Sequence, residues 1–101
     1  MNLFHNLPTN LSEEVFEDII NSDAVKIERI VSNGHSSPQG FWYDQAQNEW
    51  VMVLQGEAEL EYEDRIIKLA VGDYELIPAH RKHRVASTSS IEATIWLAIH
   101  F

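Results

Sequence analysis

The sequence predicts a single all-β domain folded as a sandwich or barrel, and three observations carry this prediction. Short runs of strand-forming residues recur along the chain, several with strict alternation of apolar and polar positions. Gly, Pro and Ser residues separate these runs at close and fairly regular spacing. The length of 101 residues suits one domain, residues 1–101, and leaves no room for a second.

The N-terminal region is the expected exception, with a short amphipathic helix over about residues 12–20. Ser12 is followed by two glutamates, which is typical of a helix start because the hydroxyl accepts an early N–H and the acids favour the positive end of the dipole. Leu11, Val15 and Ile19 fall on one side at helical spacing. We therefore expect a helix that packs this apolar side against the barrel.

Strands are expected where apolar and polar residues alternate, or where a short apolar run lies between turn residues. A basic loop, His80 to Arg84, is expected before the sixth strand, which is brief, and a turn at Ser87 to Ser90 follows it. The other predicted strands are, in order, Ala24 to Ser32, Glu49 to Gln55, Ala58 to Tyr62, Arg65 to Leu69, Tyr74 to Ile77 and Glu92 to Phe101.

Composition narrows the range of partners. Lys and Arg total 7 against 16 Asp and Glu, for a formal net charge of -9, so we expect no nucleic-acid partner and no membrane partner. The chain has no cysteine, which excludes disulfides, thiolate catalysis and sulfur-ligated metal. The N-terminus lacks a basic patch followed by an apolar core, so we expect a cytoplasmic protein.

Two spacings carry the candidate chemistry. Glu49 is followed by six residues and then Gly56, and further along Gly72 is followed by five residues, Pro78 and then His83. These spacings resemble the two motifs of the cupins, over about residues 39–87. The resemblance implies a double-stranded β-helix, the cupin or jelly-roll barrel, with Glu49 and His83 meeting in its interior.

The first cupin motif also contains a His-X-His pair, and this chain departs from it. One register places Trp42 and Asp44 at the two histidine positions, and the other places Tyr43 and Gln45 there. In the second motif, His80 stands where the family has its second Gly. The sequence leaves both registers open.

The resemblance implies a single divalent metal inside the barrel. Glu49 and His83 would be ligands, with Asp44 or His80 completing the set and Gln45 as a neutral alternative to Asp44. Carboxylate and imidazole ligands suit Zn, Fe(II), Mn or Ni. The structural alternative is that Glu49 only ends a strand and that the imidazole of His83 only bonds a backbone carbonyl.

The remaining site predictions concern the pocket. Tyr43 is the candidate acid or base, and Trp42, Gln45, Arg84 and Trp96 are the candidate pocket residues. Arg84 belongs to the basic segment and could attract an anionic ligand, or it could pair with surface glutamates.

Two further histidines, His35 and His100, are interpreted as structural, because neither has a ligand partner at a suitable spacing.

One strand predicts an apolar outer surface. If Glu49 and Val51 point inward, then Trp50, Met52 and Leu54 point outward and need a cover. The N-terminal helix or a second subunit could supply it, and we expect a homodimer.

Two functions from different classes remain. The first is a metal-dependent enzyme of dioxygenase, isomerase or decarboxylase type that acts on a small polar or aromatic metabolite. The second is a non-catalytic binding or sensory module without a metal. A purely structural barrel would leave the inward-facing Glu49 unexplained.

Overall fold

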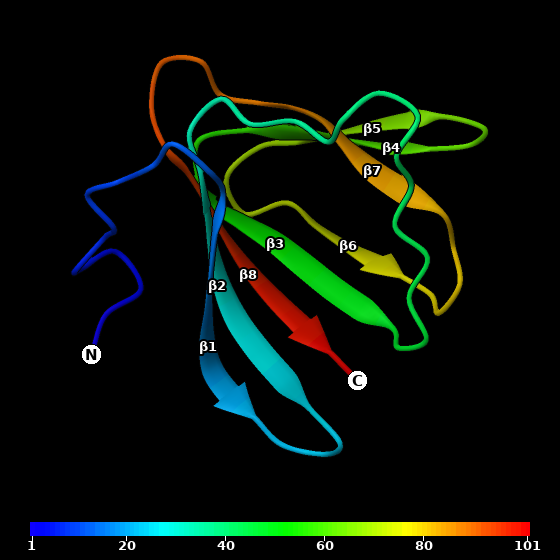
Figure 1. The fold of residues 1–101 in the computed structure, drawn as a ribbon, viewed down its shortest axis with the longest axis horizontal. Helices are drawn as coiled ribbons and strands as arrows, with labels where there is room; N and C mark the ends of the chain where they lie inside the picture. Colours follow the sequence, from blue (N-terminus) through cyan, green and yellow to red (C-terminus); the bar gives the residue numbers. More distant parts are fainter.

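The computed structural model describes residues 1–101 as two antiparallel sheets facing each other (Figure 1). The larger sheet has the order β1-β2-β8-β3-β6 and the smaller one β5-β4-β7. The strands are β1 (Val15–Asn21), β2 (Lys26–Ser32), β3 (Glu49–Gln55), β4 (Ala58–Tyr62), β5 (Ile66–Leu69), β6 (Tyr74–Ile77), β7 (His83–Thr88) and β8 (Thr94–His100). The all-β prediction is confirmed. The chain has no helix with the length and hydropathy needed to span a membrane.

The core lies between the two sheets and follows the period-two pattern of the strands. In β4, Ala58, Leu60 and Tyr62 are buried while the glutamates between them are only partly covered. Burying these apolar faces against each other is the main force that holds the sheets together. The other buried core residues are Ile30, Val51, Val53, Leu69, Ile77, Trp96 and Ala98.

The predicted N-terminal helix is wrong, because residues 15–21 form β1 instead. This strand pairs antiparallel with β2, with Phe16 opposite Ile30 and Glu17 opposite Arg29. Residues spaced by four lie on one face of a strand as well as on one face of a helix, so the spacing of Leu11, Val15 and Ile19 does not distinguish the two. Pairing with β2 decides in favour of the strand.

The expected basic loop ends earlier than predicted. Strand β7 begins at His83 and pairs with β4, with His83 opposite Tyr62 and Arg84 opposite Glu61. His83 is 4% exposed, and it is therefore an interior residue. The expected turn from Ser87 is likewise shortened, because Ser87 and Thr88 still belong to the strand.

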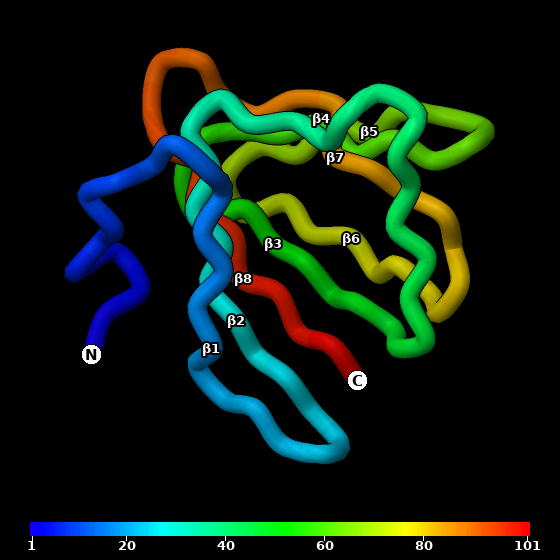
Figure 2. The backbone as a smooth tube through the Cα atoms, viewed as in Figure 1, coloured from blue at the N-terminus to red at the C-terminus, as the bar shows by residue number.

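The long connection between β2 and β3, residues 33–48, runs beside β7 on its way to β3 (Figure 2). The amide of Ser37 donates to the carbonyl of Val85 at 2.8 Å, and Tyr43 forms an antiparallel bridge with His83. The amide of His80 donates to the carbonyl of Gln45 at 2.7 Å. These bonds place the end of the connection beside β7, at the edge of the smaller sheet.

Candidate functional site

The bridge between Tyr43 and His83 decides which side chains of the connection face the interior. The amide of Tyr43 donates to the carbonyl of His83 at 2.7 Å, and the amide of His83 donates back at 3.1 Å. Directly opposed residues share a face of a sheet, and the two rings stack with centroids 5.4 Å apart. Tyr43 and Gln45 therefore take the inward positions of the family's histidine pair.

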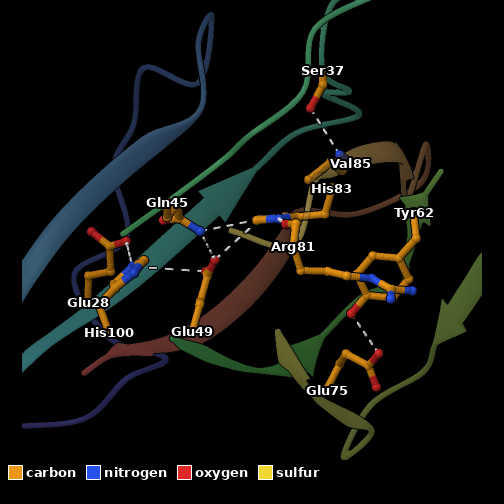
Figure 3. A network of polar contacts seen from close by, with 10 residues as sticks. All are labelled: Glu28, Ser37, Gln45, Glu49, Tyr62, Glu75, Arg81, His83, Val85 and His100. Carbon is orange, nitrogen blue, oxygen red and sulfur yellow. Dashed lines mark hydrogen bonds and ion pairs between the residues drawn. The ribbon is translucent and has the colours of Figure 1, made fainter. Parts of the chain in front are cut away.

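Glu49 and His83 meet inside the barrel, and Gln45 joins them (Figure 3). The His83 Nε2 atom lies 3.5 Å from Glu49 Oε1. The Gln45 Nε2 atom donates to Glu49 Oε1 at 2.9 Å and lies 3.4 Å from His83 Nε2. The His83 side chain is buried, with 5% exposed, and the Glu49 side chain is largely covered, with 12% exposed. The predicted meeting of these two residues is confirmed.

The backbone fixes the tautomer of His83. Its Nδ1 atom lies 2.8 Å from the carbonyl oxygen of Arg81, which can only accept, so Nδ1 carries a proton and donates. The Nε2 atom therefore faces the cavity. It can accept from the Gln45 amide when neutral, or donate to the Glu49 carboxylate when protonated.

Glu49 stays ionised despite its burial. Burial by itself raises the pKa of its carboxyl, but hydrogen bonds from His83 and Gln45, helped by the charge of His100, lower the pKa below the ordinary value. The site thus holds a carboxylate acceptor next to an imidazole that can carry a proton. Such a pair can bind a polar group and can exchange a proton with it.

A second imidazole belongs to this network, and it was interpreted as structural from the sequence. His100 lies opposite Glu49 in the sheet, and its Nε2 atom is 2.9 Å from Glu28 Oε1 and 3.9 Å from Glu49 Oε2. The hydrogen bond to Glu28 raises the pKa of His100 against the opposing effect of burial, and the charge of Glu49 raises it further. Glu28, His100 and Glu49 form a buried row of alternating charge.

Gln45, Glu49, His83 and Glu28 face a cavity of about 80 Å³ with mostly apolar walls. A more polar chamber of about 230 Å³ adjoins it and shares Glu14, Tyr43 and Val85 with it. The cavity is lined by Glu14, Phe16, Glu28, Ile30, Tyr43, Gln45, Glu49, Val51, Leu60, Ile77, His83, Val85 and Trp96. The combination of an apolar wall and a few convergent polar groups is typical of a small-molecule site.

Two of the four predicted metal ligands lie outside this cavity. The His80 Nδ1 atom is 2.8 Å from Asp44 Oδ1, and 69% of the His80 side chain and 45% of the Asp44 side chain are exposed. Asp44 alternates with the inward-facing Tyr43 and Gln45, so its carboxylate points to the other side of the segment. Asp44 and His80 therefore pair with each other instead of completing a set with Glu49 and His83.

His80 has a backbone role that its motif position explains. Its φ is 63°, in the left-handed region that favours glycine, and the family motif has a glycine at this place. The residue thus turns the chain between β6 and β7 and is not directed at the site.

Two of the four predicted pocket residues are also corrected. Gln45 and Trp96 line the cavity, whereas Trp42 and Arg84 do not. Arg84 follows the inward-facing His83, so it points outward, where it donates to Glu61 at 2.7 Å and to the carbonyl of Ser37 at 2.8 Å. Its guanidinium is thus engaged outside the cavity.

The sequence analysis missed two cavity residues, Phe16 and Glu28, and the polar role of His100 beside the cavity. Phe16 was assigned to a helix, although its pairing with Ile30 places it on the inner face. Alternation places Glu28 on one face with Ile30 and His100 on one face with Trp96, but only the sheet pairing shows that these faces are inside. A search for a second ligand at a suitable spacing along the sequence did not find these two residues, because their partners lie on neighbouring strands of the sheet.

Comparison with known proteins decides the family. The model of the cupin domain matches residues 28–100, which include both motifs and every strand from β3 onward. This chain belongs to the cupin family. No curated protein matches the sequence of this cupin.

Solved structures resemble this cupin over nearly its whole length. A candidate mannose-6-phosphate isomerase from Ralstonia eutropha JMP134 is 46% identical, with a TM-score of 0.95 over 99% of this chain and 94% of that one. A cupin superfamily protein from Desulfitobacterium hafniense is 22% identical, with a TM-score of 0.78 over 94% and 83% of the two chains. A cupin protein from Desulfovibrio desulfuricans is 20% identical, with a TM-score of 0.77 over 99% and 93%. The last two show the fold alone.

The residues of this cupin do not form a metal site as they are arranged. No group of three or more His, Asp or Glu side chains is placed to hold a metal ion. Only Glu49 and His83 converge as predicted, and the Gln45 amide presents hydrogen-bond donors to both. His100 Nε2 is already engaged by Glu28. The donor set thus differs from the three or four free ligand atoms that a divalent cation needs.

Proposed function

We propose that this cupin binds a small polar or aromatic metabolite in the barrel cavity without a resident metal ion. The observation that carries the proposal is the position of Gln45, whose amide nitrogen contacts both Glu49 and His83 and satisfies them with hydrogen bonds. The apolar walls supply contact area, and the buried polar groups supply orientation. The cytoplasmic location of the protein, which is expected from the sequence, stays a prediction.

Each polar residue has a part in this proposal. The Glu49 carboxylate accepts hydrogen bonds from the ligand, and His83 Nε2 accepts or donates according to its protonation. Burial first, and then the charges of Glu14, Glu49 and Glu28, raise the pKa of the Tyr43 hydroxyl. Tyr43 therefore stays neutral at physiological pH and acts as a hydrogen-bond donor.

Metal-independent proton transfer is a second candidate, and the contact between Glu49 and His83 favours it. A carboxylate and an imidazole 3.5 Å apart can remove a proton from one atom of a ligand and return it to another. The Ralstonia eutropha relative is named as a candidate isomerase, and isomerases often need such a step. The two candidates share one binding site and differ only in turnover.

Metal content tests the proposal directly. The protein is purified without chelator or affinity tag, and its content of Zn, Mn, Ni and Fe is measured by plasma mass spectrometry. We expect far less than stoichiometric metal, and no rise in melting temperature when these ions are added. Stoichiometric metal that is lost in both Glu49→Gln and His83→Ala would overturn the proposal and support the metal-dependent enzyme instead.

A matched variant shows that the assay can detect a metal in this barrel. The double substitution Tyr43→His with Gln45→His restores imidazoles at the two positions that face Glu49 and His83. We expect this variant to bind Zn or Ni stoichiometrically and to melt at a higher temperature when the ion is present. Equal metal content in the two proteins would show that Tyr43 and Gln45 do not determine whether a metal binds.

A further inference from the structure

The charged groups that line the cavity are acidic. Glu14, Glu28 and Glu49 face it, and no lysine or arginine is among its lining residues. Their neighbours differ, since Glu28 is paired with His100 at 2.9 Å and with Lys26 at 3.4 Å. Its charge is thus largely balanced inside the protein.

Glu14 and Glu49 each accept a hydrogen bond from a neutral side chain. The Ser32 hydroxyl donates to Glu14, and the Gln45 amide donates to Glu49 at 2.9 Å. The nearest positive group to Glu49 besides His83 is His100, at 3.9 Å. No ion pair therefore joins Glu14 to a basic side chain, and Glu49 is contacted by the imidazoles of His83 and His100 but by no lysine or arginine.

The basic side chains nearest to the barrel are engaged elsewhere. Arg84 binds Glu61 and a backbone carbonyl, and Arg81 lies over the ring of Tyr62 and binds Asp64. Arg29 binds Glu17 and carbonyl groups of the N-terminal segment. An anionic ligand would find no free cation in the cavity, and it would also meet a chain with a net charge of -9.

The acidic side chains also affect the hydroxyl of Tyr43, which lines the cavity. Burial is the first cause of its raised pKa, and the charges of Glu14, Glu49 and Glu28 all act in the same direction. Tyr43, Phe16 and Trp96 line the cavity, and aromatic rings attract cations. A neutral or anionic ligand would use only part of these features.

We propose that the ligand of this cavity is a small organic cation, such as an alkylammonium, whose apolar part contacts the walls and whose charge is neutralised by Glu14 and Glu49. This inference rests on the proposed function, because it concerns the same cavity. The walls that receive the apolar part include Ile30, Val51, Leu60, Ile77 and Val85. The acidic lining of the cavity argues against a sugar phosphate as the ligand, because the phosphate group is negatively charged.

Three probes that carry the same isobutyl group test the sign of the charge. Isobutylammonium, isobutanol and isovalerate are titrated into labelled protein, and amide chemical shifts of the cavity strands are followed by NMR. Mannose 6-phosphate is titrated as a fourth probe. We expect isobutylammonium to bind about tenfold more tightly than isobutanol, and neither anion to bind.

Variants separate the local charge from the charge of the whole chain. Glu14→Gln should weaken isobutylammonium about tenfold and leave isobutanol unchanged. Glu63→Gln removes the same charge from an exposed hairpin and should change neither affinity. A fall in isobutanol affinity in Glu14→Gln would show a loss of cavity shape and would overturn the assignment of Glu14.

The outcomes distinguish this inference from the proposed function. Isobutanol binding as tightly as isobutylammonium would overturn the charge preference and keep the cavity as a binding site. If isovalerate or mannose 6-phosphate binds more tightly than isobutylammonium, the cavity stays a binding site, but its charge preference is for anions and the inference is overturned. Binding of none of the four probes would overturn both the inference and the proposed ligand site.

Discussion

His100 is the residue whose protonation most affects the polar row inside the barrel. It is 8% exposed, and its imidazole bonds Glu28 and faces Glu49. Because Glu28 raises the pKa of His100 above the ordinary 6.5, the folded protein holds this proton more tightly than the unfolded chain does. The contribution of the pair to stability is therefore complete below about pH 6.5 and is lost as the pH rises through the pKa of folded His100.

We expect Glu28→Gln to lower the pKa of His100 and to destabilise the protein most at mildly acidic pH. The loss in unfolding free energy should be about 1–2 kcal/mol at pH 6 and should shrink towards pH 9, because a charge-assisted hydrogen bond is replaced by a neutral one. Imidazole NMR titrations and urea unfolding at several pH values measure both quantities. Glu92→Gln, at an exposed turn, should change neither. An unchanged His100 pKa in Glu28→Gln would contradict the assignment.

At the residue level, the sequence predicted one pair and left the rest open for a physical reason. Glu49 and His83 follow from motif spacing, and they do meet. The choice between the Trp42 and Tyr43 registers depends on the bridge to His83, which joins segments far apart in the sequence. Local alternation fixes relative faces but not which face is inside, so Asp44 and Gln45 could not be told apart.

At the level of elements, turn chemistry was the more reliable guide and helical spacing the less reliable one. The strands next to Gly56, Gly72 and Pro78 were predicted close to their observed bounds, because these residues set turns by their own backbone preferences. Strand β1 was missed because its bulge between Asp18 and Ile20 breaks the alternation. Only its pairing with β2 shows that the segment is extended.

Gly56 provides a test of turn chemistry between β3 and β4. Its φ is 81°, and an added Cβ would lie 2.5 Å from Thr94 Oγ1 and 2.9 Å from Thr94 Cα. Thr94 is fully buried and its hydroxyl donates to the carbonyl of Glu57, so it cannot move aside. We expect Gly56→Ala to cost about 3 kcal/mol of unfolding free energy, from backbone strain and overpacking together.

Gly72→Ala is the matched control for this prediction. Gly72 has a similar φ of 88°, but no atom lies within 4 Å of the place where its Cβ would stand. Its substitution should cost only the backbone strain, about 1 kcal/mol. Urea unfolding of both variants measures the difference, and equal costs would show that Thr94 yields to the extra methyl group.

At the scale of the whole molecule, the outer face of the larger sheet carries a continuous apolar row. Directly paired residues share a face, and the pairing joins Ile20 to Ile27, Ile27 to Ile99, Ile99 to Trp50 and Trp50 to Leu76. The row thus crosses all five strands of the sheet. A neighbouring row adds Leu97, Met52 and Tyr74 on the same face.

This face extends the apolar surface predicted from Trp50 and Met52, and the expected N-terminal helix does not exist to cover it. Ile20, Leu76 and Tyr74 remain 50%, 52% and 64% exposed in the single chain. Contiguous apolar surface of this kind is typical of protein interfaces, and the same patch on two copies can pair by twofold symmetry. We therefore propose that the protein is a homodimer that buries this row.

Light scattering at micromolar concentration tests the dimer, and we expect twice the mass of one chain. Leu76→Asp places a charge in the row and should give a monomer, because an unpaired carboxylate in an apolar interface is strongly unfavourable. Val71→Asp adds the same charge at an exposed turn residue, 63% exposed and off the sheet face, and should stay dimeric. Circular dichroism checks that both variants fold. A monomeric wild type, or a dimer unaffected by Leu76→Asp, would mean that the row does not form the interface.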